Sequence, residues 1–271
     1  MRYSFNTFNH STYYDLAPSL PAQIAAAAAA GYDHIGLDLL SVLAHERDGL
    51  APDALASLLA EHQLPCYELV SLSISADPER TRRSLGHILC TADVLHPSEV
   101  LCVVTGPLDD AVAANTAHCA EALARAGIGL SLEFLPTRDV DAIPVALRLL
   151  DRVDHPNLRL VVEAWHFFRG PSTWDDLASL ALDHIGFVQF ADAPPMVSDD
   201  LHHESMHRRV LPGEGELDLP AFCAALTGKG YDGVVSVELL SADLRAGDLA
   251  EFARATLATT RGVWEEAAIR T

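Results

Sequence analysis

Four short apolar segments of the sequence each end in a side chain that can bind a metal ion. The segments GLSLE, LRLVVE, HIGFVQ and GVVSVE end in Glu133, Glu163, Gln189 and Glu238, respectively. An apolar run of this length, bounded by polar residues, is typical of a strand that is buried on both faces, as in a parallel sheet. Packing alone does not explain an oxygen ligand at the carboxyl end of each strand. We therefore expect these side chains to meet at one metal site.

The expected ligands are carboxylates and one amide oxygen, which together form a hard donor set. Such a set favours Mn²⁺ or Mg²⁺, whereas Co²⁺ and Zn²⁺ are alternatives, and zinc is less favoured because no Cys or His ligand is evident. A metal with open positions polarises a substrate carbonyl and stabilises the enediolate that forms when the neighbouring C–H is deprotonated. Glu133 and Glu238 could face each other across the substrate as general base and acid. The alternative for Gln189 is a buried amide bonded to backbone.

Further residues near these strand ends are candidates for substrate contacts. His166 follows Glu163 by three residues and could donate a proton to a leaving hydroxyl, or it could be a structural histidine near the rim. Two arginines before the PGEGE turn could bind a hydroxyl, carboxylate or phosphate, or could pair with the acidic surface. Trp165 could wall the pocket. The two arginines before the turn are Arg208 and Arg209. Two further candidates, His10 and Glu68, lie near the ends of the first and third expected strands.

The ligand positions require a fold that collects the carboxyl ends of its strands at one face. The apolar pattern predicts strands over residues 3–8, 34–39, 66–70, 100–104, 129–133, 158–163, 185–190 and 233–238. It predicts helices near residues 21–30, 52–62, 78–95 and 109–126, one that ends near residue 153, and others near residues 172–182, 219–229 and 249–267. This alternation predicts an α/β fold, a parallel (β/α)8 TIM barrel that forms a single domain over residues 1–271.

The rival architecture is an open, doubly wound sheet. Such a sheet would normally carry a glycine-rich turn after its first strand, and the corresponding segment here, NTFNHSTYY, contains no glycine. Residues 191–216 are expected to form a long polar loop. The histidines of this loop match no tetrahedral metal-site spacing, so the loop is expected to be solvated.

Composition limits the possible partners and the compartment. With 49% hydrophobic residues the chain can build a large core, and a formal net charge of -20 repels nucleic-acid backbones. The first residues, MRYSFNTFNH, contain no apolar signal core, and no segment reaches the roughly 18 apolar residues of a membrane span. The five cysteines form no CxxC pair, as is ordinary for free thiols in a reducing compartment. We therefore expect a cytoplasmic protein that binds neither nucleic acid nor membrane.

The sequence resembles the xylose isomerase-like TIM-barrel superfamily, in particular proteins described as sugar phosphate isomerases/epimerases. The resemblance covers nearly the whole chain and is carried by LEFLPTR, NLRLVVEAWHFFRGPSTWDDL, HIGFVQFADAPP, RRVLPGEGELDL and GYDGVVSVELLS. It implies a proton-transfer pair, Glu133 and Glu238, and substrate contacts from His166 and an arginine before the PG turn. It implies that the metal ligands are Glu133, Glu163, Gln189 and Glu238.

Differences within the superfamily narrow the reaction. Gln at the third ligand position is similar to hydroxypyruvate isomerases and bacterial 3-dehydroshikimate dehydratases, whereas ketose 3-epimerases usually have His. The run from QFADAPP through Ser205 and Arg209 to PGEGELDL resembles the dehydratase branch and adds Ser205 to the candidate substrate contacts. The arginine-bearing segment expected after the third strand is replaced by ELVSLSISADPE. The usual Asp at the second ligand position is Glu163 here, one methylene longer.

The resemblance implies a divalent-metal-dependent isomerase or epimerase of a small sugar, sugar phosphate or hydroxy-keto acid, working through a metal-bound enediolate. One alternative is a lyase that dehydrates a cyclic keto-polyol such as 3-dehydroshikimate or an inosose, with His166 protonating the leaving hydroxyl. A metal- or ligand-binding barrel without catalysis is another, motivated by Glu163. The expected partners are a small carbohydrate-like molecule and further copies of the chain, as a dimer or tetramer.

Overall fold

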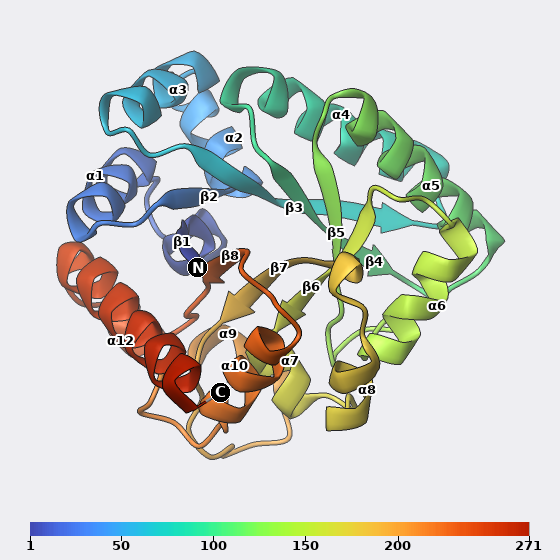
Figure 1. Cartoon of the computed structure of the whole chain (residues 1–271). Coiled ribbons are helices and arrows are strands. Elements are labelled where there is room, and N and C mark those ends of the chain that lie inside the picture. Colours follow the sequence, from blue (N-terminus) through green and yellow to red (C-terminus); the bar gives the residue numbers. More distant parts are fainter. Residues whose placement is uncertain (271) are drawn as a thin grey trace.

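Eight parallel strands pair side by side and close into a barrel in the order β1 to β8 (Figure 1). The computed structural model describes residues 1–270, so Thr271 of the expected domain lies outside the described residues. Pairing of β1 with β8 closes the barrel and excludes the open doubly wound sheet. The expected (β/α)8 barrel is confirmed. Its strands are β1 Arg2–Asn6, β2 His34–Asp38, β3 Cys66–Ser75, β4 Glu99–Thr105, β5 Gly129–Glu133, β6 Leu158–Glu163, β7 Ile185–Phe190 and β8 Val234–Val237.

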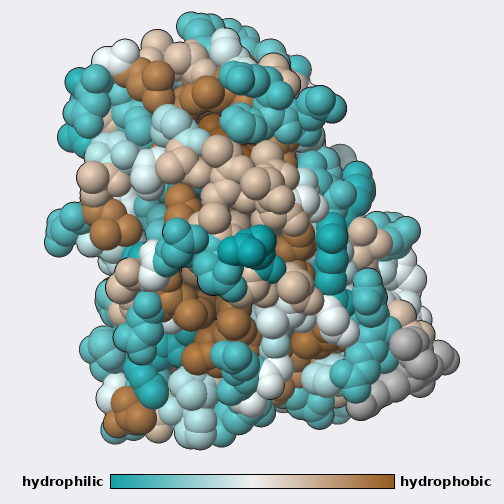
Figure 2. Space-filling view, turned by 90° about the vertical axis from the view of Figure 1, so that its left-hand side faces the viewer, coloured by the Kyte–Doolittle hydropathy of each residue, from teal (hydrophilic) through white to brown (hydrophobic). Residues whose placement is uncertain are grey.

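Helices surround the barrel and cover its outer face (Figure 1). Figure 2 looks onto the flank where α1 and α12 pack together, and hydrophilic residues there lie among apolar ones. None of the helices within residues 1–270 is both long and apolar enough to cross a membrane. The longer helices are α1 Leu20–Ala30, α2 Leu39–Arg47, α3 Pro52–Glu61, α4 Pro78–Leu95, α5 Asp110–Arg125, α6 Ile143–Val153, α10 Leu219–Gly228 and α12 Leu249–Arg270. The shorter ones are η1 Thr7–His10, η2 Thr12–Tyr14, α7 Ala164–Arg169, α8 Trp174–Ser179, η3 Leu182–His184, α9 Leu201–His207 and α11 Ala242–Arg245.

Several helices of nine residues or fewer that the sequence pattern did not predict follow strands of the barrel. They begin where a side chain accepts backbone N–H groups of the first turn: Asp38 caps α2, Glu163 caps α7 and Asp200 caps α9. Such short elements show little hydrophobic periodicity, because one face is sampled only once or twice. The segment 191–216, expected to be a loop, therefore contains α9. At the first strand, the Asn6 side chain accepts the N–H of Phe8, which ends β1 and begins η1.

A buried carboxyl group, that of Glu68, lies inside the barrel towards the amino ends of the strands. This residue was expected near the end of the third strand as a substrate contact. Because β3 continues to Ser75, Glu68 instead lies towards the amino end of its strand, and it does not line the cavity described below. Its carboxyl oxygens accept hydrogen bonds from the hydroxyl groups of Ser4, at 2.9 Å, and Ser236. Complete burial raises the pKa of Glu68 to about 7, while the serine hydrogen bonds partly oppose this shift.

We expect Glu68→Gln to stabilise the protein at pH 8 more than at pH 5. The pKa of the carboxyl rises from 4.5 to about 7 on folding, so the stability associated with its protonated form is complete below pH 4.5 and is lost as the pH rises through 7. This loss amounts to roughly 3 kcal/mol. Gln has a similar size and does not ionise. Urea unfolding of both proteins at the two pH values measures the difference, and a pH-independent difference would contradict the assignment.

Candidate active site

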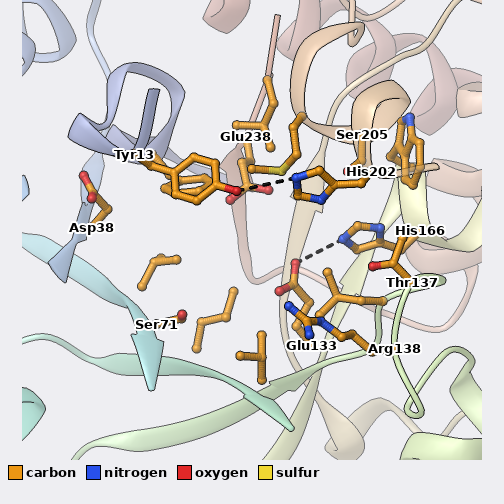
Figure 3. A pocket seen from close by; sticks show the side chains of 18 of the residues that line it. Tyr13, Asp38, Ser71, Glu133, Thr137, Arg138, His166, His202, Ser205 and Glu238 are labelled. Carbon is orange, nitrogen blue, oxygen red and sulfur yellow. Dashed lines mark hydrogen bonds and ion pairs between the residues drawn. The ribbon is translucent and has the colours of Figure 1, made fainter. Parts of the chain in front are cut away.

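A cavity of about 340 Å³ opens at the carboxyl ends of the strands (Figure 3). Two of the expected residues, Glu163 and Gln189, are completely buried and are bonded to residues of the lining rather than being part of it. The fold thus gathers most of the side chains that the sequence placed at strand ends. The expected residues that line the cavity are Glu133, Trp165, His166, Ser205, Arg209 and Glu238.

Glu133 and His166 face each other at the cavity wall. Glu133 is the last residue of β5, and its Oε1 lies 3.2 Å from His166 Nε2 (Figure 3). The position of His166 depends on the start of α7, where the two carboxylate oxygens of Glu163 accept the N–H groups of Trp165 at 2.9 Å and His166 at 2.8 Å. The imidazole Nδ1 also lies 3.3 Å from Glu163 Oε2. The histidine is therefore held between two carboxylates with one edge in the cavity.

Glu238 follows β8 directly and is buried among polar groups. Its Oε1 accepts hydrogen bonds from the amide groups of Asn6 at 3.3 Å and Gln189 at 3.2 Å. Burial raises the pKa of Glu238 to about 8; the Arg209 guanidinium lowers it, and neighbouring carboxylates raise it further. A carboxyl group with such a pKa can both carry and release a proton near neutral pH, as a general acid or base must.

Arg209 is almost completely buried, with 1% of its surface exposed. Its Nη1 donates to the backbone oxygen of Glu238 at 2.9 Å and to Glu163 Oε1 at 3.2 Å, and it lies 3.4 Å from Glu238 Oε2. Its Nε and Nη2 donate to the backbone oxygen and hydroxyl of Ser205. The guanidinium also lies 5.7 Å from the centre of the Trp165 ring. These contacts fix the orientation of the arginine at the cavity.

The structure does not bring Arg208 or His10 to the cavity. Arg208 pairs with Glu204, one turn earlier along α9, at 2.6 Å and donates to the backbone oxygen of Pro195. His10 packs edge-to-face against Phe252 of α12, with the ring centres 4.7 Å apart. Burial, assisted by a nearby arginine, lowers the pKa of His10 to about 4, so the ring packs in its neutral form. Both residues thus contact the surrounding protein rather than the cavity.

The cavity also contains polar residues that the sequence analysis did not select. Tyr13 and His202 meet over the cavity, with the tyrosine hydroxyl 3.5 Å from the histidine Nε2 (Figure 3). His202 was expected in a solvated loop, but α9 places it in the lining. Arg138 lines the cavity from the connection between β5 and α6. The LEFLPTR segment was a usable signal for Arg138, since it follows Glu133 by five residues.

The two sides of the cavity differ in polarity. Most of the titratable side chains come from the β5 to β8 half of the barrel, whereas Tyr13 and Asp38 line the cavity from the segments after β1 and at the end of β2. The half formed by β2, β3 and β4 contributes an apolar wall, so water is excluded from one side of a bound molecule. The residues of this wall are Leu39, Leu40, Val70, Leu101 and Val103.

The strand-end side chains fit a divalent metal by their donor chemistry. The amide oxygen of Gln189 is buried and has no hydrogen-bond partner, as expected of an oxygen reserved for a cation. Two carboxylates, Glu133 and Glu238, face the same cavity. In residues 1–270, however, no three His, Cys, Asp or Glu side chains are already arranged as a metal site. The carboxylates of Glu163 and Glu238 are both engaged by protein donors: Arg209 contacts both, and the first N–H groups of α7 donate to Glu163.

Similar sequences come from dehydratases, isomerases and epimerases. The chain is 29% identical to 3-dehydroshikimate dehydratase of Pseudomonas aeruginosa over 245 residues. The matched region covers 85% of this chain and 38% of the dehydratase. It is 31% identical to inosose isomerase of Halalkalibacterium halodurans over 115 residues. This matched region covers 42% of this chain and 40% of the isomerase. The chain thus spans well under half of these relatives. L-ribulose 3-epimerase of a Methylomonas species is 26% identical over 90% of this chain and 85% of its own length.

Solved structures share the fold. The IOLI protein, crystallised with a bound zinc atom, superimposes with a TM-score of 0.87 over 98% of this chain and 99% of its own, at 20% identity. Residues 24–258, most of the barrel, match the family model described as xylose isomerase-like TIM barrel. The chain therefore belongs to the xylose isomerase-like TIM-barrel family.

Proposed function

We propose that the protein is a divalent-metal-dependent isomerase or epimerase of a small polyhydroxylated carbonyl compound. The observation that supports this most strongly is the pair of carboxyl groups, Glu133 and Glu238, on opposite sides of one cavity (Figure 3). Because both carboxyl groups line the cavity, one can remove a proton from a bound molecule and the other can return one. Relatives named as an isomerase and an epimerase support the same class of reaction.

The residues divide the chemistry between them. A bound metal would supply polarisation of the substrate carbonyl, and Glu133, Gln189 and Glu238 have the oxygens to hold it. One carboxylate removes the proton from the carbon beside the carbonyl, and the other carboxyl group returns a proton. Return to the carbonyl carbon gives isomerisation, and return to the opposite face of the original carbon gives epimerisation. Arg209 donates hydrogen bonds from a fixed position, and the apolar wall keeps water from the deprotonated carbon.

Dehydration of a cyclic keto-polyol is the second candidate. It is favoured by the 3-dehydroshikimate dehydratase relative and by the position of His166, which faces the cavity beside Glu133 and could protonate a leaving hydroxyl. The wall from β3 contributes Val70 and Ser71, so no arginine from that strand binds a carboxylate of the substrate.

Glu238→Gln should abolish proton transfer while it keeps the size of the side chain and the shape of the cavity. We expect the parent protein with Mn²⁺ to exchange the hydrogen beside the carbonyl of a ketose for deuterium in D₂O, and the variant to do so about 10²- to 10⁴-fold more slowly. NMR over a panel of ketoses and keto-polyols measures the exchange. The matched control is Glu216→Gln, at an exposed ion pair with Arg169. A new conjugated chromophore would favour dehydration instead, and neither signal despite bound Mn²⁺ would favour a binding protein.

Arg138 should discriminate between charged and neutral substrates. Its guanidinium lines the cavity, whereas that of Arg209 is engaged by carboxylates. A hydrogen bond to a charged group contributes roughly 1.5–3 kcal/mol, so Arg138→Met should lower kcat/KM for a carboxylate- or phosphate-bearing substrate about 10- to 100-fold. Neutral ketoses should lose less than about twofold. Steady-state kinetics on both classes tests this, and an equal loss for both would assign Arg138 a purely structural role.

A further inference from the structure

The carboxyl group of Asp192, in the segment that follows β7, is enclosed by backbone N–H groups. Only 1% of the surface of this residue is exposed. Its Oδ1 accepts the N–H groups of Ala193 at 2.8 Å and Leu217 at 3.2 Å. Its Oδ2 accepts those of Gly213 at 2.9 Å and Gly215 at 3.0 Å. Several N–H groups that converge in this way form a concave site for an anion, and here the protein's own carboxylate fills it.

The PGEGE turn, residues 212–216, has the glycines that this close approach requires. Gly213 has a φ of +91°, in the left-handed region that favours glycine. A Cβ atom on Gly215 would lie 2.2 Å from Asp192 Oδ1 and 2.4 Å from the backbone oxygen of Ala193. Any other residue at position 215 would therefore push the turn away from the carboxyl group.

Asp192 also holds the backbone beside Arg209. The N–H of Val210 donates to the backbone oxygen of Asp192 at 2.9 Å, and the N–H of Asp192 donates back to Val210 at 3.3 Å. On the other side, the N–H of Arg209 donates to the backbone oxygen of Leu240, which follows β8, at 3.2 Å. Residues 209–210 thus lie between the segments that leave β7 and β8, and they lead directly into the turn around the carboxyl group.

We propose that Asp192 is a positioning residue for Arg209. Its carboxyl group fixes the PGEGE turn, and the turn fixes the backbone from which the buried guanidinium reaches the cavity. Asp192 does not line the cavity itself, so it acts through the arginine. The importance of this contact for the reaction rests on the proposed function, whereas the positioning does not.

The Nε–H signal of Arg209 in a ¹H–¹⁵N NMR spectrum of the metal-free protein tests this role without a substrate. The group donates to the backbone oxygen of Ser205 at 3.0 Å, and its signal is identified by its loss in Arg209→Met. We expect Asp192→Ala to raise the rate of hydrogen exchange at this group about tenfold or more, because the turn is released. Sodium formate at about 0.1 M should restore most of the protection by binding to the four N–H groups. Benzoate, which is too large for the same space, should not restore it.

Two further variants keep this test specific. Asp218→Ala is the matched control, because it removes a carboxyl group that accepts a backbone N–H at the exposed start of α10, and it should leave the Arg209 signal unchanged. Gly215→Ala crowds the Asp192 carboxyl group from the turn, so it should also raise the exchange rate, but without a response to formate. It carries the test if Asp192→Ala does not fold. An unchanged Arg209 signal in either folded variant, or an increase in Asp192→Ala that formate does not reverse, would overturn the positioning role.

Deuterium exchange beside the carbonyl of a ketose, measured with Mn²⁺, gives a second readout. Asp192→Ala should exchange about 10- to 100-fold more slowly than the parent protein, because a displaced Arg209 loses a charged hydrogen bond to the substrate. Formate should recover most of this loss, and the parent protein in formate is the control. A parent protein that exchanges no ketose would contradict the proposed function and leave the NMR test in force. Exchange at the parental rate, in a variant whose Arg209 signal has lost its protection, would overturn the importance of this contact for the reaction.

Discussion

The end of the barrel that holds the cavity depends on compensation of buried negative charge. The parallel strands deliver Glu133, Glu163 and Glu238 to one region of low exposure, where burial and the neighbouring carboxylates raise the pKa of Glu238. Arg209 offsets this repulsion from within the protein, through contacts to two of the carboxylates. One arginine therefore compensates two of these carboxylates, whereas Glu133 contacts His166 instead.

The polarity of the cavity wall complements this arrangement. A substrate with its carbonyl and hydroxyl groups towards the β5 to β8 half would place its other face against the leucine and valine side chains of the β2 to β4 half. Tyr13 and His202 meet above it and narrow the entrance. The same division of surface suits proton transfer beside a carbonyl, because the deprotonated carbon is kept from water while the oxygens reach hydrogen-bond donors.

Most of the barrel could be predicted from the sequence. Buried parallel strands appear in it as continuous apolar runs, and helices appear as apolar residues repeated every three or four positions. The strand-end rule also predicted that Glu133 and Glu238 would share a cavity. Glu68 was misplaced because the polar, serine-rich second half of β3 does not resemble a buried strand, so the strand was expected to end at residue 70. The role of Glu163 depends on a six-residue helix that the pattern could not reveal. His202 was missed because the short helix α9 places it in the cavity lining, which the local sequence pattern did not indicate.

Anomalous X-ray diffraction from crystals grown with Mn²⁺ would test the central claim most directly, because it locates the ion and its ligands in one experiment. The account predicts one strong peak at the mouth of the barrel, bonded to oxygens of the strand-end side chains Glu133, Gln189 and Glu238. The absence of a peak there at saturating Mn²⁺ would contradict the metal-dependent function. A peak bonded elsewhere in the protein would contradict the role assigned to these strand-end oxygens.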